Sequence, residues 1–107
     1  MNVEMEKFLE MPPREELELP VVLHAFSDPI RLAVLRELAD GAERVCGTFE
    51  LPVSDSTRSH HLKILRQAGV TATRVVGTQR LVSLRRGDLD ARFPGLLDSV
   101  LTAAQPG

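Results

Sequence analysis

The sequence predicts a mainly helical domain that carries one small β-hairpin. Two helix-start signals, Asp28-Pro29 and Ser54, each precede apolar residues at helical spacing. Two β-prone runs, residues 70–76 and 79–85, flank Gly77-Thr78 and predict the hairpin. A chain of 107 residues with 43% hydrophobic content suits one globular domain, because a second core would be too small to be stable.

The two ends of the chain are expected to lie outside this domain. Residues 1–14 are acidic and end in Pro12-Pro13, which cannot sit inside a helix. We therefore expect a flexible acidic arm over residues 1–14, with at most a helical turn around Phe8. The domain itself is expected over residues 15–103, followed by a disordered tail over residues 104–107.

Two helices are predicted in the first half of the domain. Pro20 suits the first position of a short apolar helix that ends near Phe26. Asp28 is a good N-cap for the next helix, and Gly41 suits the left-handed residue beyond its end. The apolar stripe of this second helix is wide, so we expect it to be central and buried; its members are Ile30, Leu32, Val34, Leu35 and Leu38.

A third long helix is predicted from Ser54 to Ala68, with Gly69 as its terminator. Leu62, Leu65 and Ala68 face inward, and a polar face lies largely opposite them. Residues 42–53, between the second and third helices, allow at most a brief helix or a turn, since Pro52 prevents a longer one.

The hairpin and a terminal helical stretch complete the order of elements. Gly77-Thr78 fits a two-residue turn with glycine at its first position. Asp88 is a candidate cap for a last helical stretch, which is interrupted at Pro94-Gly95. Beyond the interruption, another apolar stripe follows; it consists of Leu96, Leu97, Val100 and Leu101.

Charge is strongly segregated along the chain. Residues 54–86 contain seven lysines and arginines against one aspartate, a net charge of +6, whereas residues 1–53 carry −6 and residues 87–107 carry −2. Such a block is often only a solvated face, but here it coincides with the third helix and the hairpin. Because a DNA major groove admits one α-helix, the coincidence predicts a winged helix-turn-helix that binds DNA.

Three stretches of the sequence carry a family resemblance over roughly residues 20–101. FSDPIRLAVLREL, VSDSTRSHHLKILRQAGV and RVVGTQRLVSLR closely resemble the ArsR/SmtB-type transcriptional regulators. The resemblance implies a homodimer that binds palindromic double-stranded DNA and represses transcription, and whose DNA affinity an effector changes. It also implies that the terminal helices pair across the two-fold axis, through Val22, Phe26, Leu96, Leu97, Val100 and Leu101.

The same resemblance places the groove-facing side chains on the third helix. Together with the hairpin candidates, the expected DNA-binding residues are Asp55, Ser56, Thr57, Arg58, Ser59, His60, Lys63, Arg66, Arg74, Gln79 and Arg80. Arg58 departs from the branched apolar residue that many relatives carry. Its side chain could reach DNA or pair with an acid inside the domain, and the sequence leaves both readings open.

Metal binding is open at the level of sequence. The neighbours His60 and His61 point about 100° apart on a helix, so His60 is better explained as a DNA contact and His61 as a packing residue. The cysteine pair and terminal-helix histidines of the family's usual metal sites are absent. A Ni²⁺ or Zn²⁺ effector site that uses His24 is the weak candidate, although a partly buried, satisfied His24 is the better reading. Cys46 is expected to be a buried, inert thiol.

Other classes of function fit less well. Asp55, Ser59 and His60 have the residue types of a catalytic triad, but near neighbours on a helix fan out around its axis, so we expect no enzyme. A winged-helix module that binds protein instead of DNA is the alternative. No long apolar run or signal peptide is present, which favours a cytoplasmic protein with no membrane contact. A small effector or a second regulatory protein remains open as a further partner.

Overall fold

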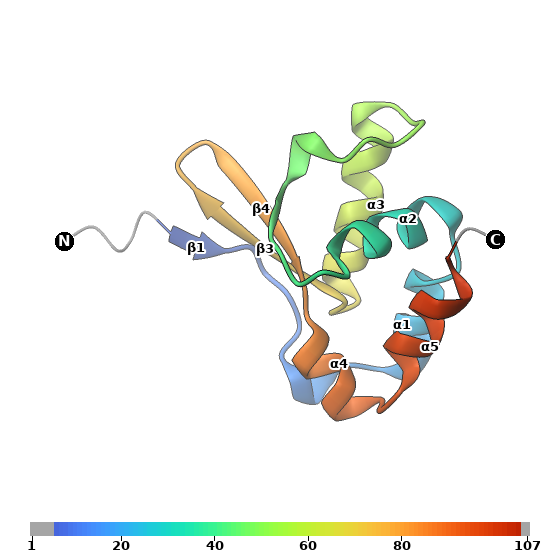
Figure 1. Cartoon of the computed structure of the whole chain (residues 1–107). Coiled ribbons are helices and arrows are strands. Elements are labelled where there is room, and N and C mark those ends of the chain that lie inside the picture. Colours follow the sequence, from blue (N-terminus) through green and yellow to red (C-terminus); the bar gives the residue numbers. More distant parts are fainter. Residues whose placement is uncertain (1–5, 106–107) are drawn as a thin grey trace.

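A computed structural model describes residues 6–105, and within them helices pack around a four-stranded antiparallel sheet (Figure 1). The elements are β1 (Glu6–Phe8), α1 (Leu19–Ala25), α2 (Pro29–Leu38), β2 (Arg44–Val45), α3 (Asp55–Gln67), β3 (Thr71–Val76), β4 (Gln79–Leu84), α4 (Arg86–Arg92) and α5 (Leu96–Ala103), with 3₁₀ turns at Arg14–Glu16 and Cys46–Thr48. The strand order is β1-β3-β4-β2. This is the predicted winged helix-turn-helix, with β3 and β4 as the wing.

The capping residues start the two long helices where the sequence predicted. Asp28 Oδ1 accepts hydrogen bonds from the backbone N–H of Ile30 (2.8 Å) and of Arg31 (3.2 Å), at the first turn of α2. Ser54 Oγ accepts from the backbone N–H of Thr57 at 3.2 Å, at the first turn of α3. Both side chains satisfy backbone donors that a helix N-terminus otherwise leaves without partners.

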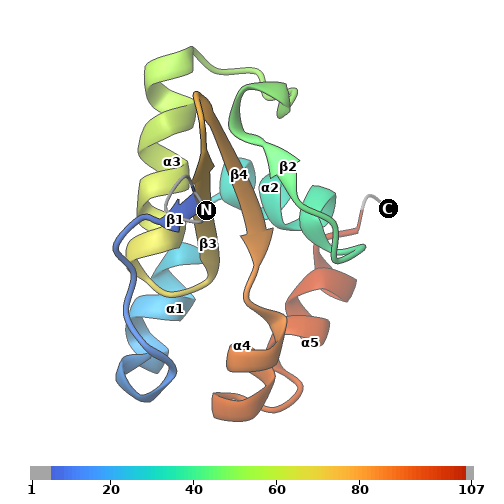
Figure 2. The same cartoon turned by 90° about the vertical axis from the view of Figure 1, so that its left-hand side faces the viewer.

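One continuous hydrophobic core joins the helices to the sheet. Leu35 and Leu38 of α2, Leu65 of α3 and Val82 of β4 are all at most 1% exposed. Because the apolar stripes of α2 and α3 both face this core, α3 is held with its opposite face toward solvent. Figure 2 shows α3 along one side of the hairpin and β2 along the other.

The hairpin forms in the predicted register. Val76 pairs with Gln79, which leaves Gly77-Thr78 as the two-residue turn. Gly77 has a φ of +59°, in the left-handed region that glycine enters without a steric penalty.

Two local predictions differ from the structure. Residues 44–45, where we expected a turn or short helix, form β2 and pair with Val82 and Leu81 of β4. Asp88 does not cap α4: the N-cap is Arg85, and Asp88 is the third residue of the helix, in its first turn. Its carboxylate instead accepts from Arg14 Nε at 2.7 Å and from Arg85 Nε at 2.9 Å.

The segment before α1 is ordered by long-range contacts rather than forming a flexible arm. Phe8 of β1 pairs with Arg74 of β3, and the backbone N–H of Leu9 donates to the carbonyl of Thr73 at 2.9 Å. Leu17 is 1% exposed, so the segment also enters the core. The strand replaces the helical turn expected at Phe8, since the outer edge of β3 would otherwise leave its backbone polar groups without strand partners.

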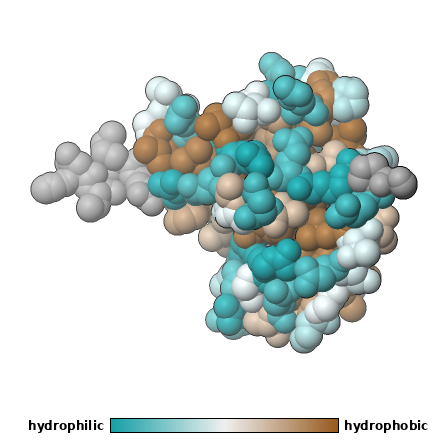
Figure 3. Space-filling view, viewed as in Figure 1, coloured by the Kyte–Doolittle hydropathy of each residue, from teal (hydrophilic) through white to brown (hydrophobic). Residues whose placement is uncertain are grey.

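Residues 1–5 of the expected arm and residues 106–107 of the expected tail lie outside the described residues. Figure 3 shows hydrophobic surface at the hairpin end of the sheet, where Phe8 of β1 is 53% exposed.

Candidate nucleic-acid interface

The face of α3 that points away from the core is polar and open to solvent. Leu62 and Leu65 are buried, whereas the exposed residues of the helix include Asp55, Ser56, Thr57, Ser59, His60 and Lys63. All six were candidates for DNA contact. Their hydroxyl, imidazole and ammonium groups can hydrogen-bond to base edges or to phosphate oxygens, whereas the carboxylate of Asp55 repels phosphate.

The tip of the hairpin extends this polar face. Gln79 and Arg80 are exposed beside the turn. Ser59 and Arg66 of α3 line one small hollow together with Arg80 of β4 and Cys46. The helix and the wing therefore contribute side chains to one surface, which we call the reading face: the exposed side of α3 with Gln79 and Arg80. Cys46 is partly exposed at its edge, and not buried as expected.

Two candidate arginines are held in ion pairs. Arg74 donates to both carboxylate oxygens of Glu43, at 2.9 and 2.6 Å, and this interaction holds the pKa of Glu43 below its ordinary value. Arg58 Nη2 lies 3.3 Å from Asp55 Oδ1, and the Arg58 side chain is only 17% exposed. Arg58 thus pairs with an acid, but this acid is one turn away on the same helix and 91% exposed, and does not lie inside the domain.

Arg85 and Arg86 lie away from the reading face, which corrects the idea that all seven cations of residues 54–86 share one side. Both follow the end of β4 that is distant from the hairpin turn. Arg85 binds Asp88 at 2.9 Å, and Arg86 Nη1 lies 2.8 Å from Asp98. The sequence could not show this, because their acidic partners follow outside the basic block.

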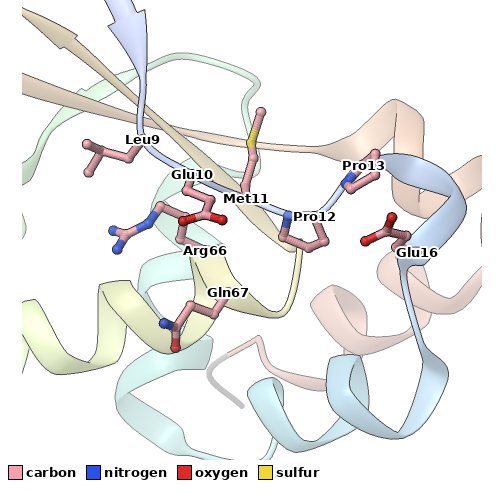
Figure 4. A pocket seen from close by; sticks show the side chains of 8 residues that line it. All are labelled: Leu9, Glu10, Met11, Pro12, Pro13, Glu16, Arg66 and Gln67. Carbon is pink, nitrogen blue, oxygen red and sulfur yellow. The ribbon is translucent and has the colours of Figure 1, made fainter.

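Arg66 is only partly exposed because the N-terminal segment crosses the end of α3. Figure 4 shows that Leu9 to Pro13 run past the last turn of α3, from which Arg66 and Gln67 project. Among the described residues, the Nε atom of Arg66 is buried without a hydrogen-bond partner. Arg66 therefore lies at the border between the reading face and the hollow of Figure 4.

The three histidines have different surroundings. His60 is exposed on α3, and His61 packs inward with its Nδ1 atom 3.1 Å from Nη1 of Arg31. His24 is exposed, and not partly buried as the sequence suggested. Within residues 6–105, no group of three or more His, Cys, Asp or Glu side chains is placed to hold a metal ion.

The expected dimer residues are mostly part of the protomer's own core. Val22 (0% exposed), Phe26 (6%), Leu97 (1%) and Leu101 (8%) are buried, so they cannot form a surface for a second copy. Leu96 and Val100 of α5 are partly exposed.

The exposed apolar residues of α1 are instead Leu19, Val21 and Leu23, at 43–44%. Leu19 and Leu96 line one open groove with Phe93 and Ser99, so α1 and α5 present a shared apolar surface. The i, i+4 spacing of Leu19 and Leu23 was the signal that the sequence reading missed.

Comparison with known proteins gives a consistent result. The family described as "Bacterial regulatory protein, arsR family" matches residues 28–71, which span α2 to the first residue of β3. An uncharacterized HTH-type transcriptional regulator of Bacillus subtilis, YceK, is 34% identical over 96 residues, covering 87% of this chain and 96% of the relative.

Two further relatives match shorter parts. An uncharacterized HTH-type transcriptional regulator of Methanocaldococcus jannaschii is 44% identical over 59 residues (53% of this chain, 66% of the relative). The arsenical resistance operon repressor of Staphylococcus xylosus is 35% identical over 74 residues (68% of this chain, 71% of the relative). Among the described residues, no helix is both long and apolar enough to cross a membrane.

Proposed function

Since the chain belongs to the arsR family of bacterial regulatory proteins, and is thus a DNA-binding transcriptional regulator, we propose that it binds a palindromic operator as a homodimer. The observation that carries the proposal is the reading face: α3 buries Leu62 and Leu65 and leaves Ser59, His60 and Lys63 exposed, with Arg80 of the wing beside them. A helix presented in this way can enter the major groove while the wing follows the backbone.

The side chains of the reading face divide into two roles. Lys63 and Arg80 are exposed cations and are assigned to phosphate, where they fix the position of the protein without reading sequence. His60 and Ser59 are assigned to base edges, since their donors and acceptors can distinguish base pairs. Arg74 and Arg58 are assigned a supporting role, because Glu43 and Asp55 already bind their guanidinium groups.

The second copy is proposed to dock on the apolar surface of α1 and α5. Leu19, Val21 and Leu23 are exposed on α1, and Leu96 lines a groove together with Leu19. Leu19 and Leu23 share one flank of α1 by their i, i+4 spacing, and exposed apolar side chains grouped in this way are unfavourable in a lone small domain and typical of an interface. A two-fold axis through this surface would present two copies of α3 to successive major grooves.

Repression is the proposed direction of regulation, because one relative is a repressor of an arsenical resistance operon. We propose that the protein works in the cytoplasm, where the operator DNA lies, and assign it no catalytic activity.

Selection of bound duplexes from a random pool tests the proposal. We expect the full-length protein to enrich an inverted repeat whose half-sites lie about 10 base pairs apart, centre to centre. The variant His60→Ala should bind that duplex with about tenfold less discrimination against a scrambled one, as expected for loss of one base contact. The variant His24→Ala, which removes an exposed histidine from α1, is the matched control. Enrichment of no duplex would contradict the proposed function, and unchanged discrimination in His60→Ala would remove His60 from the reading face.

A further inference from the structure

The guanidinium group of Arg31 lies at the junction of three helices. Arg31 belongs to the first turn of α2, and it is only 5% exposed. Its Nε donates to the carbonyl of Ala25 at 2.8 Å and its Nη2 to the carbonyl of His24 at 3.1 Å. Both carbonyls lie in the last turn of α1. The carbonyl of His24 also accepts from the backbone N–H of Ser27 at 3.0 Å and from its hydroxyl at 2.6 Å. Arg31 therefore adds a side-chain donor to both carbonyls at the C-terminal end of α1.

The third contact of Arg31 reaches α3. Its Nη1 lies 3.1 Å from Nδ1 of His61, whose side chain is 12% exposed. A guanidinium group carries only donors, so Nδ1 of His61 is the acceptor in this hydrogen bond. Only the ring form with its proton on Nε2 can accept at Nδ1. The Arg31 side chain, which is buried and positively charged, therefore connects the C-terminal end of α1 to the middle of α3.

Protonation of His61 would remove this contact. A proton on Nδ1 takes the lone pair that accepts from Arg31 and places two cations side by side. Asp28 Oδ1, 3.9 Å from Nδ1, is the partner that a protonated ring would turn toward, although it already accepts from the backbone of Ile30 and Arg31. The ring thus has two partners, one for each charge state.

Other titratable groups lie on α3 itself and on the elements packed against it. On α3, the ring of His60 lies 6.1 Å from that of His61, and Arg58, one turn earlier, pairs with Asp55 at 3.3 Å. On α2, Arg36 is exposed and Glu37 is partly exposed. The remaining elements that pack closely on α3 are α1 and β3. Their titratable side chains within the described residues are His24, which is exposed, and Arg74, which binds Glu43. Arg31 and Asp28 are therefore the charged groups that respond directly to a change at His61.

We propose that the Arg31–His61 hydrogen bond positions α3 against α1 and α2, and that loss of this bond on protonation of His61 weakens operator binding. The proposal rests on the proposed function and adds regulation to it. Arg31 and His61 act as positioning residues, because they hold the reading face in place without contacting DNA. Histidine is suited to this role, since its charge ordinarily changes between pH 5 and 8.

The test compares the wild-type protein with His61→Asn across about pH 8 to about pH 5.5. Asparagine places an oxygen acceptor near the position of Nδ1 and does not titrate. The probe is the duplex enriched from the random pool, and affinity is measured by fluorescence anisotropy. We expect the wild-type affinity, relative to that of His61→Asn, to fall about tenfold as the pH is lowered. His60 is present in both proteins, so the ratio reports the change at position 61.

The matched control is His24→Asn, which removes an exposed histidine and should keep a constant ratio to the wild type. A flat ratio for His61→Asn, with tight binding by the wild type at about pH 8, would overturn this inference and leave the proposed function intact. Absence of duplex binding by the wild type at that pH would instead contradict the proposed function.

A second measurement needs neither DNA nor a variant. Long-range ¹H–¹⁵N NMR spectra of the histidine rings report which ring nitrogen carries the proton. At about pH 7.5 we expect Nδ1 of His61 without a proton and Nε2 with one. A proton on Nδ1 at that pH would overturn the proposal, because Arg31 could then not donate to it.

Discussion

The side chain of Leu17 fills the space beside Gly69 where any other residue would place its Cβ atom. Gly69 follows α3 with a φ of +86°, and an added Cβ would overlap Leu17 Cδ2 and lie 3.2 Å from Cγ of Pro12. The end of α3 and the start of the wing are therefore packed directly against the segment that precedes α1. Gly69 is thus required twice, once by its left-handed backbone conformation and once by the close contact with Leu17.

The substitution Gly69→Ala should lower the free energy of unfolding by about 3 kcal/mol. About 1 kcal/mol arises from the positive φ and the rest from overpacking against Leu17. The matched control is Gly41→Ala, since Gly41 has a φ of +84° but no atom within 4 Å of the added Cβ. Urea denaturation of both variants measures the difference. Equal losses of unfolding free energy in the two variants would show that the Leu17 side chain moves aside without a measurable cost, and that its packing against Gly69 is unimportant.

Asp88 should make stability depend on pH in the acid range. Hydrogen bonds from Arg14, above all, and from Arg85 hold the pKa of the Asp88 carboxyl below its ordinary value, against the opposing effect of burial. A carboxyl with a lowered native pKa stabilises the fold above its unfolded pKa, and this contribution is lost as the pH falls through the native value.

The variant Asp88→Asn should therefore be less stable than the wild type by about 1 kcal/mol at pH 7. The difference should shrink as the pH falls below about 3.8, the ordinary value of an aspartate. Chemical denaturation at several pH values measures it. Asp40→Asn serves as a control, because Asp40 forms an exposed pair with Arg44. A constant difference between Asp88→Asn and the wild type across the acid range would contradict this account.

The elements that the sequence predicted best are those whose signals are local. Asp28, Ser54 and Gly77 each act on backbone groups within three residues, so the starts of α2 and α3 and the hairpin turn followed from neighbouring residues. The strands β1 and β2 could not be predicted in this way. Each is two or three residues long and forms only because β3 or β4 offers it an edge.

The sequence predicted which face of α3 is exposed, but it did not predict which arginines of the basic block are paired with carboxylates. The exposed face of α3 followed from helical periodicity, whereas the partners of the arginines depend on tertiary contacts. Arg74 meets Glu43, 31 residues away, and Arg86 meets Asp98 from the next helix. Burial of Val22 was also not predictable from composition, because both the buried and the exposed positions of α1 are apolar.

Substitution of Leu23 by glutamate should separate the proposed dimer without unfolding the protomer. Leu23 is 44% exposed, so the charge can stay in water in the monomer but not in an interface. We expect a monomer by sedimentation equilibrium and at least about tenfold weaker operator binding. The contrasting variant is Val22→Ala, which should lower stability by about 2 kcal/mol and keep the dimer, because Val22 is 0% exposed. A Leu23→Glu protein that stays dimeric would place the interface elsewhere.

The salt dependence of operator binding tests most directly whether the reading face contacts DNA. Lys63 and Arg80 give about four phosphate contacts in a dimer, so the plot of log affinity against log salt should have a slope of about −3.6. Lys63→Ala removes two of these contacts per dimer and should reduce the slope to about −1.8. Arg36→Ala, which removes one exposed charge from α2, should leave the slope unchanged. If Lys63→Ala keeps the wild-type slope, or if the wild type binds independently of salt, α3 and the wing are not the surface that meets DNA.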